Sequence, residues 1–235
     1  MVSAKAARGG STIGELRQSG AMKLLFPRPD PALLQAIVIN SAGGITGGDS
    51  FALTARAEAQ AALSLTTQAA ERAYRAQPGQ VAALRNTLTV DSGATLHWLP
   101  QETILYDGCA LRRHLTVDLA QDASLLLVEP LVFGRAAMGE ALRHAYFRDR
   151  IEVNRAGQPL FHDAMTLSGD VTAHLGAPHI AAGAGALATL IYVAPDAEAR
   201  LPRLRAQLPD IAGASLIGPD LLVARILAAD SFDLR

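Results

Sequence analysis

Several features that would assign a function directly are scarce in this sequence of 235 residues. It has one cysteine, Cys109, so no disulfide can form within the chain, and a lone thiol suits a reducing compartment. Aromatic residues make up only 5%, which leaves alanine and leucine to build most of the core. The formal net charge of −1 gives no overall field that would attract nucleic acid or an anionic membrane.

Long hydrophobic runs are also missing. Residues 1–20 contain no apolar stretch of signal-peptide length. The most apolar long stretch, residues 180–194, is interrupted by glycines and is shorter than a membrane span. These absences predict a cytoplasmic protein with neither a membrane nor a nucleic acid as its partner.

Familiar catalytic and nucleotide-binding motifs are absent too. No Gly-x-Ser-x-Gly marks a hydrolase nucleophile. The glycine-rich segment 42–49 invites a phosphate-loop interpretation, but Asp49 and Ser50 stand where a phosphate loop has Lys and Ser or Thr. A carboxylate beside a phosphate would repel it. We therefore interpret the glycines as a bulge or hairpin where backbones approach closely.

Metal-ligand spacing is not evident. A catalytic zinc site usually needs three protein ligands, and the histidines are scattered. Cys109 can bind a soft metal together with a histidine, but no second thiol supports this. We expect no permanently bound metal or cofactor. The six histidines are His97, His114, His144, His162, His174 and His179.

Strand patterns dominate what is present. Apolar residues alternate with polar ones through 51–58, 84–90 and 111–119, the period of a half-buried strand. Residues 124–133 form a nearly continuous apolar run, as expected for a strand covered on both faces. Asp107-Gly108 is a strong hairpin signal.

Turn signals recur about every 8 to 14 residues, which favours short antiparallel strands over strand–helix–strand units. The prediction is a mainly β fold in one domain, 1–235, made of two packed sheets or a flattened coil of strands with about two helices. One helix should follow Pro195, with Asp196 as its cap and leucines at positions 201, 204 and 208. A second, short helix is expected in 134–142.

Two side chains in the predicted strands stand out. Arg113 falls on the apolar face of its strand, so it is either buried with a carboxylate or located at a bulge. Trp98, the only tryptophan, stands on an alternating strand that favours a core position.

Three closely spaced segments carry most of the information: residues 40–51 (NSAGGITGGDSF), 66–75 (TTQAAERAYR) and 98–108 (WLPQETILYDG). Each joins strand-like residues to uncharged polar residues and a few charges, as in a surface built for recognition. Arginine and tyrosine are frequent at interface hot spots. The candidate interface residues are therefore Arg72, Tyr74 and Arg75, with an ordinary exposed turn as the alternative.

Together with segments 16–23, 134–140 and 157–160, in this order, these motifs resemble the urease accessory protein D family, called H in some bacteria. The resemblance implies a helix-poor body of stacked β-sheets. It implies a non-catalytic chaperone-like scaffold that binds accessory protein F, which recruits the GTPase accessory protein G. The assembly would dock on apo-urease for GTP-dependent nickel insertion. Family members usually continue into a helical C-terminal segment, which is expected to be short or missing here.

Nickel would then be a transient cargo rather than a cofactor. A permanent cluster of imidazoles and thiolates would trap the ion, so a path needs scattered oxygen ligands. The candidates for lining this path are Asp49, Glu102, Asp107, Glu129 and Glu140. Two other hypotheses stay open: a metal-dependent hydrolase using Asp49, His162 and Asp163, and a structural β-module without a partner.

Overall fold

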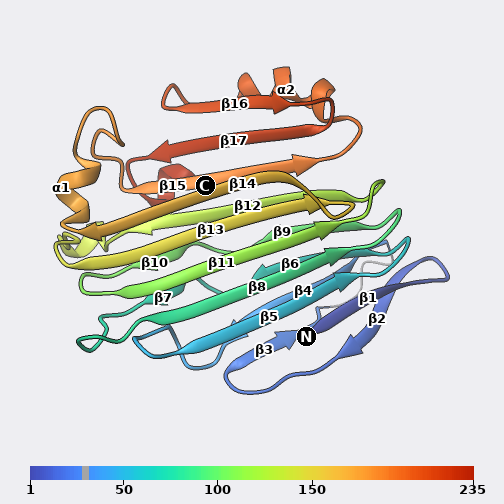
Figure 1. The fold of residues 1–235 in the computed structure, drawn as a ribbon, viewed down its shortest axis with the longest axis horizontal. Helices are drawn as coiled ribbons and strands as arrows, with labels where there is room; N and C mark the ends of the chain where they lie inside the picture. Colours follow the sequence, from blue (N-terminus) through green and yellow to red (C-terminus); the bar gives the residue numbers. More distant parts are fainter. Residues whose placement is uncertain (28–31) are drawn as a thin grey trace.

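The computed structural model describes residues 1–27 and 32–235, which form two β-sheets lying face to face (Figure 1). Sheet A contains, in spatial order, β14 (Gln158–Gly169), β13 (Ala145–Arg155), β11 (Ala110–Leu119), β8 (Ala82–Val90), β5 (Ser50–Ala57), β1 (Val2–Ala7) and β2 (Gly10–Leu16). Sheet B contains β16 (Ala212–Ile217), β17 (Leu221–Ala228), β15 (Ala186–Val193), β12 (Ser124–Phe133), β9 (Thr95–Leu99), β6 (Ala62–Thr67), β4 (Leu34–Asn40) and β3 (Met22–Leu25). Two short strands, β10 (Thr103–Leu105) and β7 (Glu71–Ala73), extend sheet B beside β12.

Helices are few, and the mainly β prediction is confirmed. The described chain has α1 (Val171–Leu175), α2 (Ala197–Arg205), α3 (Ser231–Leu234) and one 3-10 turn, η1 (Ala136–Met138). The helix predicted after Pro195 is α2, although it ends before Leu208. Asp196 does not cap it through its side chain, because that carboxylate accepts hydrogen bonds from Tyr192 and Arg200 instead. Residues 134–142 form only η1, and α1 and α3 were not predicted.

The chain winds as a flattened coil, one of the two architectures that the sequence predicted. From β4 to β13 it alternates between the sheets, and each long strand lies parallel to the one before it in the same sheet. Antiparallel pairs occur at the flanks, so the sheets are mixed rather than purely antiparallel. Parallel neighbours need a long crossover. Here a strand in the opposite sheet forms that crossover. Turn spacing alone could not distinguish this arrangement from a hairpin.

Two turn sequences have different roles in this arrangement. Asn154 to Gly157 joins the antiparallel pair β13 and β14, with Ala156 and Gly157 at φ values of 48° and 75°. Asp107-Gly108 does not form the predicted hairpin, because it connects β10 in sheet B to β11 in sheet A. The motif therefore lies at a corner between the sheets.

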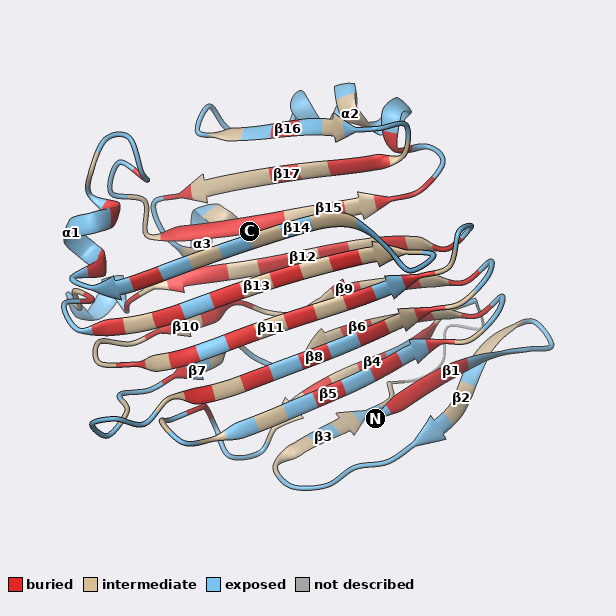
Figure 2. Ribbon diagram, in the orientation of Figure 1, coloured by how far each residue is buried: buried red, intermediate tan, exposed pale blue. Residues whose placement is uncertain are grey.

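The core fills the space between the sheets, where buried and exposed residues alternate along the strands (Figure 2). Inward residues are mainly leucine, valine and alanine, and Trp98 is buried as predicted. Along β12 only one face is fully buried and the other is half-buried, so the expected double coverage is incomplete. No helix within residues 1–27 or 32–235 has the length and hydrophobicity needed to cross a lipid bilayer.

Candidate functional site

The three informative segments meet at one end of the coil. Residue 45 forms a parallel bridge with Ala73, and its backbone exchanges hydrogen bonds with Arg72 and Tyr74 at 2.7 and 2.8 Å. Strand β7 pairs with β10, and the Glu71 N–H donates to the Glu102 carbonyl at 2.9 Å. Segments separated by about thirty residues thus form one structural unit.

The glycine loop leaves room for the Tyr74 ring. Gly44 has a φ of 157°, and a Cβ placed there would collide with the Tyr74 ring and lie 2.9 Å from the Arg72 carbonyl oxygen. The Tyr74 hydroxyl donates to the Gly43 carbonyl at 3.2 Å. Asp49 accepts a hydrogen bond from the Thr46 N–H at 2.8 Å and closes the loop. The interpretation as a close backbone approach is therefore confirmed.

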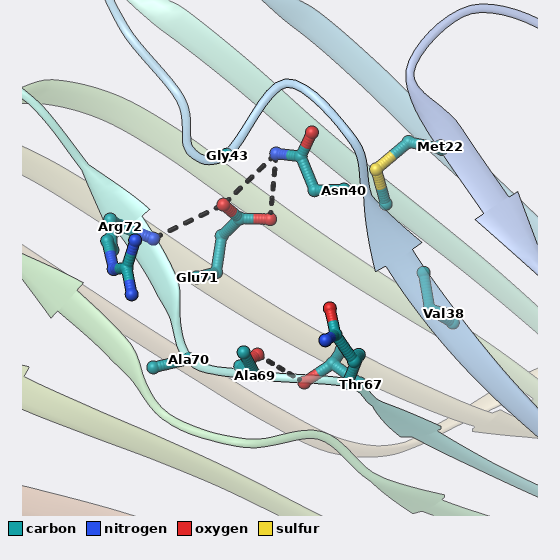
Figure 3. A pocket seen from close by; sticks show the side chains of 10 residues that line it. Met22, Val38, Asn40, Gly43, Thr67, Ala69, Ala70, Glu71 and Arg72 are labelled. Carbon is teal, nitrogen blue, oxygen red and sulfur yellow. Dashed lines mark hydrogen bonds between the residues drawn. The ribbon is translucent and has the colours of Figure 1, made fainter.

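A cavity of about 250 Å³ opens beside these motifs (Figure 3). Its walls come from β3, β4, the end of β6 and β7, and it carries both polar and apolar groups. A smaller void of about 40 Å³ shares four of its lining residues and is lined by side chains from both sheets, including that of Glu129. The shared residues are Met22, Val38, Thr67 and Glu71.

Glu71 is the carboxylate of the outer cavity, and the sequence interpretation missed it. Both of its oxygens accept from Asn40 Nδ2 at 3.1 Å, as Figure 3 shows, and Oε1 also accepts the Arg72 N–H at 3.2 Å. Burial raises the pKa of Glu71, while the Asn40 amide opposes that shift. No ion pair involves Glu71 in the described chain. Its position inside the motif with Arg72 and Tyr74 was the signal available in the sequence.

Two of the predicted path residues, Asp107 and Glu140, do come together. Asp107 pairs with Arg75 at 2.7 Å, accepts the N–H groups of Arg143 and His144, and donates its own N–H to Glu140. Burial alone would raise the pKa of Asp107, but these backbone donors and Arg75 lower it overall. Hydrogen bonds from Arg135 lower the pKa of Glu140. Both carboxylates are thus held ionised and paired.

The predicted interface residues form an exposed surface around this unit. The Tyr74 ring meets Tyr106 edge-on at 5.1 Å between centroids, and Arg135 lies 4.3 Å above the Tyr106 ring. Arg72 and Arg75 are exposed on either side, and Met138 nearby is 73% exposed. Tyrosine and arginine side chains held this rigidly lose little entropy when they bind a partner.

Arg113 is the centre of a buried charge network, which answers the question that its sequence position raised. Its guanidinium forms two hydrogen bonds to Asp149, at 2.9 and 2.6 Å, and one to Glu129 at 2.6 Å. Glu129 also accepts the Trp98 Nε1–H at 2.6 Å. Burial raises the pKa of Glu129, against the attraction of Arg113. Arg113 is therefore buried with carboxylates, and the alternative prediction, that it lies at a bulge, is wrong.

The remaining candidates lie apart. Glu102 is buried and pairs with Arg235 at 2.8 Å. Asp49 precedes β5, whereas His162 and Asp163 lie on β14, four strands away in sheet A, which separates them by roughly 19 Å. Asp163 is paired with Arg225. The hydrolase hypothesis loses its site, and the described residues contain no group of three metal-ligand side chains.

Cys109 is a core residue, not a reactive thiol. It is buried, and burial raises its pKa to about 11. We expect a thiol-specific disulfide reagent at pH 8 to leave the native protein unmodified and to react with one equivalent in denaturant, because only the thiolate attacks. Rapid reaction of the native protein would contradict the buried position.

Fold and site together define a class of protein: a two-sheet β coil whose distinctive motifs gather at one end around a carboxylate cavity and an arginine–tyrosine surface. A family model described as UreD urease accessory protein matches residues 1–235. The chain therefore belongs to the UreD urease accessory protein family.

Individual relatives agree. A "Urease accessory protein UreD" from Ruegeria pomeroyi is 59% identical over 225 residues, which cover 96% of this chain and 88% of the relative. A protein of the same description from Ruegeria sp. TM1040 is 55% identical, covering 97% of this chain and 79% of the relative. One from Roseobacter denitrificans is 51% identical, covering 100% and 85%.

Proposed function

We propose that this protein is a non-catalytic scaffold of urease maturation. It binds accessory proteins F and G, docks on apo-urease, and supports GTP-dependent nickel insertion. Nickel passes through it as cargo and is not retained. The observation that carries this proposal is the outer cavity at Glu71, which shares four lining residues with the void that reaches the interior.

The chemistry of the cavity suits passage rather than storage. Nickel prefers imidazole nitrogen and thiolate sulfur for tight binding. This cavity offers the carboxylate of Glu71, the amides of Asn40 and Gln68 and the hydroxyl of Thr67. Its sulfur atom is the uncharged thioether of Met22, not a thiolate. Scattered oxygen donors bind a divalent cation weakly, so it can leave again. Glu71 is the carboxylate best placed to receive the ion, because its side chain hydrogen-bonds only to a neutral amide and a backbone N–H.

The predicted path residues fall into three sets on this proposal. Asp107 and Glu140 hold the outer unit together through Arg75 and Arg135. Glu129 and Glu102 are buried; Glu129 lines the void, whereas Glu102 does not, although its neighbours Gln101 and Thr103 do. Asp49 shapes the glycine loop. A nickel role for each remains a proposal.

Replacement of Glu71 tests the path. We expect Glu71→Gln to lower nickel-dependent activation of apo-urease roughly tenfold or more, because loss of even a hydrogen-bonding partner of a metal ligand costs about 10- to 100-fold. Co-purification with F and G should be unimpaired. The measurement is urease activity after in vitro activation at limiting nickel. Glu198→Gln, on the exposed helix α2, is the matched control. Unchanged activation by the Glu71 variant would contradict the assignment.

Binding tests the scaffold role separately. The tagged protein should co-purify with F, with G through F, and with apo-urease. Failure of all three associations would refute the scaffold, whatever the behaviour of the Glu71 variant.

A further inference from the structure

A second surface, made of residues outside the three motifs, carries an unusual charge arrangement. On the outer face of sheet A, four arginines and a histidine occupy neighbouring positions of three adjacent strands. We call this set the arginine face. It consists of Arg85 on β8, Arg112 and His114 on β11, and Arg148 and Arg150 on β13.

Strand register brings these cations close together. Arg112 is directly opposite Arg148, and His114 lies between Arg85 and Arg150 in the next row. Neighbouring strands are about 4.8 Å apart, and like charges directly opposite one another destabilise a sheet. The arrangement therefore works against folding and calls for another explanation.

Carboxylates of the protein neutralise only part of the positive charge of the arginine face. Glu152 pairs with Arg150 and, at 2.8 Å, with His114. Within the described chain, Arg85, Arg112 and Arg148 form no ion pair with a carboxylate, and Arg112 instead lies 5.8 Å above the Tyr146 ring. All three are exposed. Three positive charges thus project from one small area of a chain whose net charge is −1.

The shape of the area suits a protein partner. The residues of the arginine face, together with Ala83, line a hollow of about 290 Å³. The neighbouring outward positions carry small side chains such as Ala52, Ala164 and Thr166, which leave the hollow open to a partner. Helices α2 and α3 pack on strands of sheet B, and in Figure 1 no helix crosses the front of β8, β11 and β13.

We propose that the arginine face docks a partner protein through an acidic surface, with aspartate or glutamate side chains entering the hollow between the guanidinium groups. Arginine suits this role because its planar fork matches a carboxylate. Nucleic acid is the weaker match, since the hollow has no exposed aromatic ring on which bases would stack. The proposal rests on the scaffold role and identifies the surface that the scaffold uses.

Charge reversal tests it on the full chain. The variant Arg85→Glu/Arg112→Glu/Arg148→Glu is compared with Arg8→Glu/Arg17→Glu/Arg203→Glu, which changes the net charge equally at exposed positions elsewhere. The probes are apo-urease and the accessory proteins F and G of the same organism, each in a kinetic binding assay at low and high salt. For at least one probe, we expect the association rate to fall roughly tenfold or more in the first variant, with most of its salt dependence lost. The control variant should bind as the wild type does.

Each other outcome overturns the proposal. If the first variant binds every probe as the wild type does, the arginine face is not a docking surface, but the scaffold role stands. If the wild type itself binds no probe, the scaffold role fails as well.

Inorganic phosphate at millimolar concentration that occupies the hollow without affecting any partner would make it a free-anion site. Loss of binding to a DNA duplex alone would make it a nucleic-acid site. Unchanged thermal unfolding of the variant shows that altered binding is not a folding defect.

Discussion

Replacement of Arg113 by methionine should cost about 3–5 kcal/mol of unfolding free energy, because it leaves Asp149 and Glu129 buried without their cation. Methionine fills similar volume, so the loss reports charge rather than a cavity. The measurement is urea unfolding followed by far-ultraviolet circular dichroism. Whole domains are stable by about 5–15 kcal/mol, so this change removes a large fraction of the total.

A matched control separates a buried ion pair from an exposed one. Arg225→Met breaks the pair with Asp163, where the arginine side chain is 41% exposed, and should cost only about 0–1 kcal/mol. Adding Asp149→Leu and Glu129→Gln to Arg113→Met should recover much of the loss, since the unpaired charges are removed and Trp98 keeps an acceptor. If Arg113→Met costs no more than the control, the network contributes little to stability.

The second large effect is expected at Gly44. Alanine there requires both an unfavourable φ and displacement of the Tyr74 ring. We expect Gly44→Ala to destabilise the protein by about 1–3 kcal/mol and to weaken binding of the accessory proteins, because Tyr74 and Arg75 would lose their positions. Binding by calorimetry and unfolding by urea measure the two effects.

The control for Gly44 is Gly213→Ala. A Cβ at Gly213 meets no atom within 4 Å, and the residue has no positive φ. This change should alter stability by less than about 0.5 kcal/mol. Equal behaviour of the two variants would show that the loop tolerates a shifted Tyr74.

Expectations from sequence succeeded where a short-range pattern has one physical cause. The alternation in 84–90 and 111–119 defined which side chains face the core, because successive residues in a strand point to opposite sides. The leucines after Pro195 indicated a helix for a similar reason. Arg113 was recognised as out of place in its pattern, but its two carboxylate partners are 16 and 36 residues away and could not be identified.

Candidate site residues were identified less completely. The motifs around Tyr74 and Asp107 were singled out, and the structure places them side by side. Glu71 was overlooked although it stands in the same segment, because nothing local distinguishes a carboxylate facing a cavity from one facing solvent. The arginine face was invisible too, since its residues come from strands that register alone brings together.

The sequence by itself determined that this protein is β-rich and helix-poor, which faces of its strands are buried, and that its motifs resemble those of the family to which it belongs. Those properties depend on neighbours along the chain and on residue types. Only the tertiary structure decided that strands joined by short turns enter opposite sheets and lie parallel to their counterparts one coil later. The physical reason is that strand partners, ion pairs and cavity walls are chosen by packing across the two sheets, over separations at which the chain carries no local signal.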